Sequence, residues 1–198
     1  MRVLGLGPMA ALCLGLLILG GVRAADEPKT ELKAGDKAPD FTIKDDADKD
    51  WKLSDHIGKS IIVLYFYPGD LTGGCTKQAC GFRDDSKKLA DKGVQVIGVS
   101  GDSVKNHQLF KKEHKLEFTL LADEDGKVAK AFGVPFKVGG ESKVKVGGDD
   151  VTLKRGATIN RWTFVIGKDG KLIDVNSKVV AAEDSKKILE LVEKLDKK

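Results

Sequence analysis

Two cysteines, Cys75 and Cys80, and the nearby Thr72 are the residues of this sequence best suited to chemistry. They lie in residues 68–80, directly after the apolar run of residues 61–67. A proline and several glycines then force the chain to turn, and helix-forming residues follow, so Cys75 is predicted in the first turn of a helix. Unpaired N–H groups and the positive end of the helix dipole favour a thiolate there. Cys75 is therefore predicted to be a nucleophile.

The arrangement Pro-x3-Thr-x2-Cys, set between a buried strand and a helix, resembles the active-site loop of the peroxiredoxins. Its continuation from Cys75 to Cys80, Cys-Thr-Lys-Gln-Ala-Cys, is similar to the subgroup called bacterioferritin comigratory protein or peroxiredoxin Q. The resemblance extends from about residue 35 to the C-terminus. It departs from the family at Gly73, where the family usually has proline, and in the extra residues between Val134 and Arg161.

This resemblance implies that Cys75 is the peroxidatic cysteine and Cys80 the resolving cysteine, with Pro68, Thr72 and Arg161 completing the catalytic site. It implies a thiol-dependent peroxidase that reduces hydrogen peroxide and organic hydroperoxides through a Cys75 sulfenic acid and an intramolecular disulfide. The expected partner is a thioredoxin-like reductant. No metal or organic cofactor is expected, and the sequence leaves monomer and homodimer open.

The spacing of the two cysteines predicts a conformational change. On an intact helix, residues five apart rise about 7.5 Å and their Cα atoms lie about 8 to 9 Å apart. A disulfide tolerates a Cα separation of at most about 7 Å. The helix must therefore open locally, and Gly73, Gly74 and Gly81 favour opening because glycine weakens a helix by about 1 kcal/mol.

Two other readings of the cysteines remain open at this point. A thiol–disulfide oxidoreductase of the thioredoxin fold would suit the same elements, but such enzymes usually carry Cys-x2-Cys rather than Cys-x4-Cys. A binding domain stabilised by a structural disulfide is the other reading. It is disfavoured because a bridge at this spacing within a helix is strained.

The elements around the motif predict an α/β protein with a thioredoxin-like fold, in which a central mixed sheet has helices on both faces. The apolar runs 61–67 and 94–100, joined by the cysteine helix, predict parallel strands with the cysteine loop at their carboxyl end. Residues 39–54 predict a hairpin that covers a sheet edge, and residues 161–175 predict an antiparallel hairpin. A final helix is predicted over 181–195.

An insertion and three histidines complete the pattern. Residues 136–160 alternate in polarity around Gly147-Gly148 and predict an inserted β-hairpin. His56, His107 and His114 are interpreted as surface or partly buried side chains rather than metal ligands, because no cysteine or carboxylate set accompanies them.

Residues 1–24 predict a cleaved signal peptide, with Arg2 before an apolar stretch and small residues at the cleavage site. This predicts an exported, periplasmic protein without stable membrane insertion after cleavage. A mobile leader over 25–34 and one domain over 35–198 should follow. Removing Arg2 and Arg23 lowers the net charge from +4 to +2. With charges of both signs interspersed, no nucleic-acid partner is expected.

Overall fold

A five-stranded mixed sheet in the order β11-β10-β3-β4-β5 lies at the centre of the structure. β3 (Ile61–Phe66) pairs in parallel with β4 (Val94–Ser100), and β4 pairs in parallel with β5 (Thr119–Ala122). β10 (Trp162–Ile166) runs antiparallel to β3 and to β11 (Leu172–Asn176). The parallel pair and the late hairpin are thus confirmed. They place the cysteine loop at the carboxyl end of β3.

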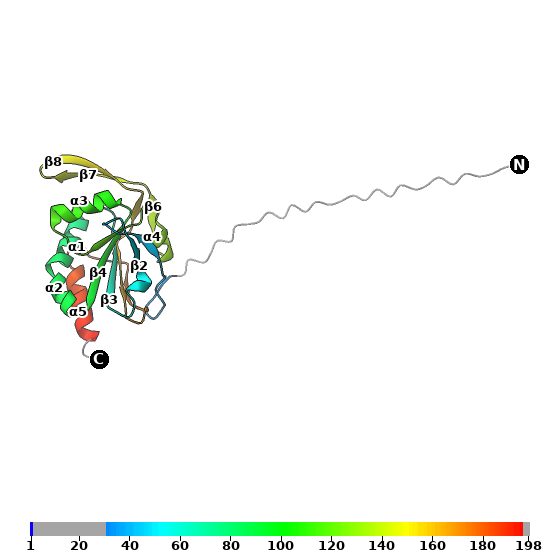
Figure 1. Ribbon diagram of the computed structural model, residues 1–198, viewed down its shortest axis with the longest axis horizontal. Coiled ribbons are helices and arrows are strands. Elements are labelled where there is room, and N and C mark those ends of the chain that lie inside the picture. The colour runs from blue at the N-terminus through cyan, green and yellow to red at the C-terminus, as the bar shows by residue number, and fades with distance from the viewer. Residues whose placement is uncertain (2–30, 196–198) are drawn as a thin grey trace.

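This computed structural model describes Met1 and residues 31–195 (Figure 1). The predicted signal peptide, apart from Met1, and residues 25–30 of the predicted leader lie outside the described residues. Within the rest of that leader, Leu32 packs against the hydrophobic core. No helix of the described residues is long and apolar enough to cross a membrane.

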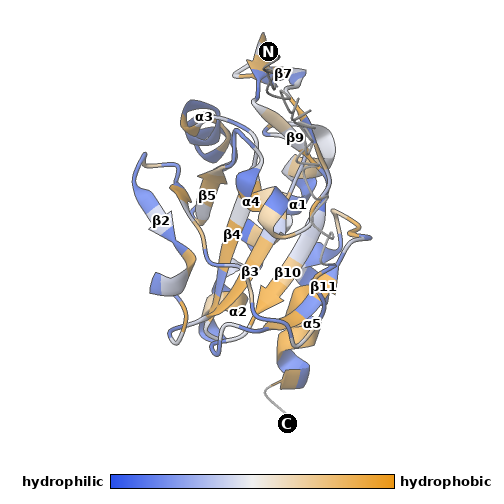
Figure 2. Ribbon diagram, turned by 90° about the vertical axis from the view of Figure 1, so that its right-hand side faces the viewer, coloured by the Kyte–Doolittle hydropathy of each residue, from blue (hydrophilic) through white to orange (hydrophobic). Residues whose placement is uncertain are grey.

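Helices cover both faces of the sheet, as predicted. In chain order the α-helices of the described residues are α1 (Gly73–Asp84), α2 (Ser86–Asp91), α3 (Val104–His114), α4 (Lys127–Ala131) and α5 (Asp184–Leu195). α1, α2, α3 and α5 pack on the face of β3 that carries Val63 and Tyr65, and α4 packs on the face that carries Ile62 and Leu64. Figure 2 shows the hydrophobic colour concentrated on β3 and β10, as expected for strands buried on both faces.

The predicted N-terminal hairpin is present and lies at the sheet edge. β1 (Thr42–Lys44) pairs antiparallel with β2 (Asp50–Lys52), and the short 3-10 helix η1 (Leu53–Asp55) follows. Asp45 forms an isolated antiparallel bridge with Leu121 of the edge strand β5. The hairpin therefore shields that edge, which would otherwise expose unpaired backbone groups.

The insertion forms a hairpin in two parts. β6 (Phe136–Val138) pairs with β9 (Ala157–Ile159), and beyond them β7 (Glu141–Val146) pairs with β8 (Asp149–Lys154) around the predicted glycine turn. Figure 1 shows the outer part extending along α3. There the backbone N–H of Gly147 donates to the Glu113 carboxylate of α3 at 3.4 Å.

Gly98 of β4 tests how tightly the core is packed around the sheet. A Cβ atom there would lie 2.7 Å from Leu120 Cδ2 and 2.8 Å from Tyr65 Cζ. We expect Gly98→Ala to lower the free energy of unfolding, measured by urea denaturation, by about 1 to 3 kcal/mol, as overpacking does. Gly73→Ala is the control because no atom lies within 4 Å of a Cβ there. Equal stability of both variants would contradict this packing.

Candidate active site

The structure places the Cys75 sulfur at the start of α1 and beside a cation. Cys75 is the third residue of the helix, where its backbone N–H belongs to the turn without intrahelical acceptors. It is 1% exposed. Arg161, which directly precedes β10, donates from Nη2 to the sulfur at 3.1 Å. Two residues 86 positions apart in sequence thus meet at the sulfur, which accepts a hydrogen bond from a cation at the start of a helix.

Thr72 and Pro68 shape the loop that leads to this sulfur. Thr72 is the N-cap residue of α1, but its hydroxyl donates to the carbonyl of Gly69 at 3.0 Å and does not cap the helix. Its oxygen keeps lone pairs that can accept another hydrogen bond. Between these residues Leu71 has a φ of 59°, a conformation that costs a residue with a Cβ about 1 kcal/mol or more.

Two residues without a predicted role hold Arg161 in place. Arg161 donates from Nη1 to the side-chain oxygen of Gln78, which is fully buried one turn after Cys75 on α1. Gln78 donates in turn to Asp184 of α5 at 2.7 Å, and Thr163 donates to the same carboxylate at 2.8 Å. Burial raises the pKa of Asp184, although the two donated hydrogen bonds oppose the rise.

The sequence contained a signal for only one of these two residues. Gln78 follows Cys75 by three positions, a spacing that puts both side chains on one face of a helix. Asp184 opens α5, more than a hundred residues further along the chain. Only the tertiary structure brings it to the site.

Cys80 lies on the same helix as Cys75, and both cysteines are free. Cys80 is half-buried, and α1 is continuous from before Cys75 to beyond Cys80. Residues five apart on an intact helix are too far apart for a disulfide, so the two cysteines cannot be bridged in this conformation.

A buried charged pair lies on the other side of the loop and corrects one prediction. His107 was expected at the surface or partly buried, but it is fully buried, with Nδ1 2.8 Å from the Asp70 carboxylate. Asp70 is also fully buried and accepts a hydrogen bond from the Tyr67 hydroxyl at 2.7 Å. The prediction was wrong because the partner carboxylate belongs to a loop far from α3 in sequence. Only such a partner makes burial of this imidazole favourable.

Burial and neighbouring charges shift the pKa values of this pair and of Tyr67. Burial alone lowers the pKa of His107, but the charge of Asp70, its hydrogen bond and the charge of Asp102 outweigh burial and raise it. For Asp70 burial has the opposite effect and raises the pKa, while His107 opposes that rise. The phenol of Tyr67 stays protonated at neutral pH, because burial and then Asp70 raise its pKa well above the usual value.

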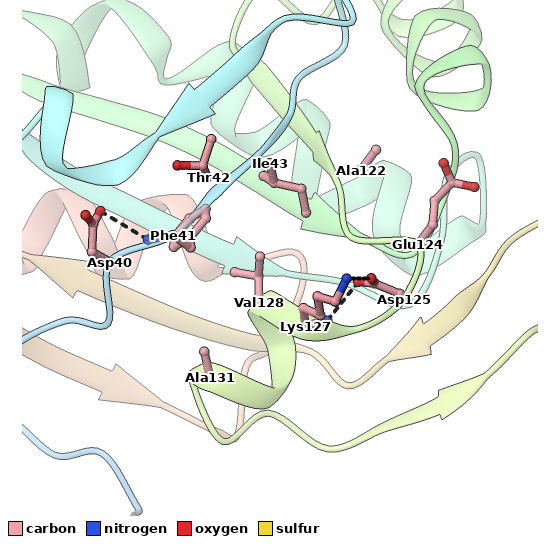
Figure 3. A pocket seen from close by; sticks show the side chains of 10 residues that line it. All are labelled: Asp40, Phe41, Thr42, Ile43, Ala122, Glu124, Asp125, Lys127, Val128 and Ala131. Atoms are coloured by element: carbon pink, nitrogen blue, oxygen red, sulfur yellow. Dashed lines mark hydrogen bonds and ion pairs between the residues drawn. The ribbon is translucent and has the colours of Figure 1, made fainter.

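A pocket elsewhere on the molecule is separate from these residues. It has a volume of about 490 Å³ and lies between the strand β1 and the helix α4. Figure 3 shows its lining, with Phe41 and Val128 at the centre and an ion pair between Lys127 and Asp125 beside them. None of the five predicted site residues lines it. Among the described residues no group of His, Cys, Asp or Glu side chains could hold a metal ion.

Comparisons with known proteins identify the family of the chain. The chain matches the model of the AhpC/TSA family over residues 34–175. It is 41% identical to Peroxiredoxin Bcp of Bacillus subtilis over 84% of this chain and 99% of that protein. Chloroplastic peroxiredoxin Q of Sedum lineare is 52% identical over 51% of this chain and 54% of its own length. The crystal structure of peroxidoxin BcpB from Mycobacterium tuberculosis matches with a TM-score of 0.69 and 32% identity, covering 83% of this chain and 98% of the other.

A thioredoxin-like sheet, with a buried cysteine that accepts a hydrogen bond from an arginine at the carboxyl end of a central strand, indicates a thiol-dependent enzyme. The chain belongs to the AhpC/TSA family, and within it to the bacterioferritin comigratory protein and peroxiredoxin Q group of peroxiredoxins. It is accordingly a thiol-dependent peroxidase, and the predicted family, fold class and type of activity are confirmed.

The raised pKa of His107 predicts that the free energy of unfolding falls as the pH rises. Its pKa is raised in the folded chain above the value of about 6.5 in an unfolded chain. Its stabilising contribution is therefore full below about pH 6.5 and is lost as the pH rises through the folded-state pKa. We expect urea denaturation between about pH 6 and pH 9 to show this fall in the wild type and a smaller fall in His107→Gln.

His114→Gln is the matched control for this measurement. Burial lowers the pKa of the half-buried His114, so removing that imidazole should not reduce the fall. An identical pH dependence in the wild type and His107→Gln would contradict the assignment.

Proposed function

We propose that Cys75 is the peroxidatic cysteine for hydrogen peroxide and organic hydroperoxides. Its thiolate attacks one oxygen of the peroxide, so that an S–O bond forms while the O–O bond breaks. Cys75 is oxidised to a sulfenic acid, and the departing oxygen takes a proton to leave as water or an alcohol. The observation that carries this proposal is the 3.1 Å contact between Arg161 Nη2 and the sulfur.

Arg161 is assigned two roles, one before the attack on the peroxide and one during it. Before it, the guanidinium stabilises the buried thiolate, which would be costly without a cation. During it, negative charge moves to the departing oxygen, and a donor already aimed at the reacting atoms needs little reorganisation to stabilise that charge. Gln78 and Asp184 position the guanidinium through the hydrogen bonds described above.

Thr72 and Pro68 are assigned to substrate orientation. The Thr72 hydroxyl donates to Gly69, which leaves its oxygen to accept a hydrogen bond from a peroxide O–H. Pro68 sets the direction of the chain as it leaves β3, since its ring restricts φ to about −65°. Together they define the approach to Cys75.

Cys80 is assigned as the resolving cysteine. After α1 opens, the Cys80 thiolate attacks the Cys75 sulfur, an S–S bond forms, and the sulfenic oxygen leaves as water after protonation. The exposed Gly73 and Gly74 at the start of α1 support such opening, because neither contributes a side chain that holds the first turn to the core. The disulfide is then reduced by a dithiol of the thioredoxin type.

Export places that reductant outside the cytoplasm. The apolar segment after Arg2 and the small residues up to Ala24 support cleavage of a signal peptide and a periplasmic location. A mature protein that remained permanently oxidised in periplasmic extract, without turning over peroxide, would contradict this part of the proposal.

Mass spectrometry with limiting peroxide tests the roles of the two cysteines. We expect the wild type to lose two hydrogens as one intramolecular disulfide forms, and Cys80→Ser to retain a sulfenic acid or form a dimer through Cys75. Cys75→Ser serves as the unreactive control. Full peroxide reduction by Cys75→Ser, or reduction of insulin disulfides without peroxide consumption by the wild type, would contradict the proposal.

Arg161→Ala should slow the oxidation of Cys75 by hydrogen peroxide by about 10²- to 10³-fold, the usual effect of removing one donor to a developing charge. Stopped-flow measurement of the second-order rate constant gives the comparison. Lys178→Ala, which removes an exposed cation near β11, is the control and should react at the wild-type rate. A rate within threefold of wild type in Arg161→Ala would show that the contact is dispensable.

A further inference from the structure

A second set of buried polar groups lies against the cysteine loop, away from the groups that contact the sulfur. Its centre is Asp102, which follows β4 and is fully buried. Asp102 accepts hydrogen bonds from the backbone N–H of Asp70 and from the Ser100 hydroxyl, both at 2.9 Å. A buried carboxylate that fixes the loop backbone needs a cation nearby.

Arg155 supplies that cation from the insertion. It directly follows β8, and its side chain is 5% exposed. Its Nε lies 3.6 Å from Asp102 Oδ1, which makes an ion pair but is too long for a hydrogen bond. Its Nη2 donates to the Ser142 hydroxyl of β7 at 2.5 Å, so the guanidinium is held from the hairpin side as well.

The same guanidinium packs directly on the backbone of the loop. A Cβ atom at Gly69 would lie 2.4 Å from Arg155 Cζ and 2.5 Å from its Nε, so the absence of a side chain at Gly69 makes this close approach possible. The carbonyl of Gly69 accepts the Thr72 hydroxyl at 3.0 Å. A continuous set of contacts therefore leads from Arg155 through Gly69 to Thr72.

Further contacts tie the insertion to the elements around the loop. Asn106 of α3 donates to Asp102 Oδ1 at 3.0 Å and to the Lys154 carbonyl at 2.9 Å. The backbone N–H of Gly156 donates to the Gly101 carbonyl at 2.9 Å. The base of the insertion is thus joined to the fold on both sides of Arg155, which gives the guanidinium a defined position.

We propose that Arg155 is a positioning residue for the Cys75 loop. It acts through Gly69, on whose backbone the guanidinium packs, and through Asp102, which accepts the N–H of Asp70. Together these contacts fix the loop backbone at Gly69 and Asp70 and hold the Thr72 hydroxyl where a peroxide binds. The positive φ of Leu71 shows what is being held, since this backbone conformation is unfavourable and requires external contacts to persist. The inference rests on the proposed function of Cys75 and Thr72, and it gives the insertion a part in the reaction.

The experiment compares two reactions of the same sulfur in Cys80→Ser protein. Oxidation by hydrogen peroxide requires an oriented substrate, whereas alkylation by iodoacetamide requires only an accessible thiolate. We expect Arg155→Ala to slow oxidation at least tenfold and to change alkylation by less than twofold. Arg155→Lys keeps a cation for Asp102 but lacks the planar group on Gly69. Compared with Arg155→Ala, it should recover stability against unfolding but only part of the oxidation rate.

Gly69→Ala tests the contact from the other side. In Cys80→Ser protein that retains Arg155, the new Cβ should displace the guanidinium and slow oxidation. In protein that already carries Arg155→Ala, Gly69→Ala should slow oxidation little further. Lys143→Ala removes an exposed cation from the same hairpin and should oxidise at the wild-type rate.

An unchanged oxidation rate in Arg155→Ala would overturn the role of Arg155, as would equal losses in oxidation and alkylation, which indicate general disruption of the loop. Additive effects of Gly69→Ala and Arg155→Ala would overturn the coupling between them. Failure of the proposed function looks different, because then the parent Cys80→Ser protein itself would not react with peroxide.

Discussion

The site depends on one contact, the hydrogen bond that Arg161 donates to the almost completely buried sulfur of Cys75. A buried polar group without a partner is unfavourable, so both the sulfur and the guanidinium need partners at the start of α1. The first turn of α1 contributes its free N–H groups, and Arg161 contributes a full positive charge at 3.1 Å. Gln78 and Asp184 hold that cation. α1, the residue before β10 and the first residue of α5 are therefore linked by one chain of hydrogen bonds that ends at the sulfur.

The proposed reaction makes a second demand on the same helix. The contact between Arg161 and the Cys75 sulfur belongs to an intact first turn, whereas the proposed disulfide between Cys75 and Cys80 requires that turn to unwind. Proteins reconcile such demands by giving one segment a low local stability within a stable domain. The exposed glycines before Cys75 lower the stability of α1 at this end, while its other side packs into the core through Ala79 and Phe82.

Other buried ionisable side chains lie at the carboxyl end of the sheet without contacting the sulfur. Asp70, His107 and Asp102 are each fully buried, and every carboxylate among them has a donor. Such networks are favourable only when their members are satisfied, and they then define one geometry. Here that geometry belongs to the loop before Cys75. Arg155 extends the network into the insertion, which makes the hairpin part of the surroundings of the active site.

The sequence alone determined the helix that carries Cys75, the parallel strands and the inserted hairpin, because local periodicity, turn residues and a contiguous motif carry that information. It could not determine the partners of buried polar groups. His107 was expected at the surface or partly buried, and Asp184 and Arg155 had no expected role, since each acquires its environment from residues distant in the chain. Only the folded arrangement of α3, α5 and the insertion around the loop decides those contacts, because the free energy of a buried charge depends on what lies within a few ångströms of it.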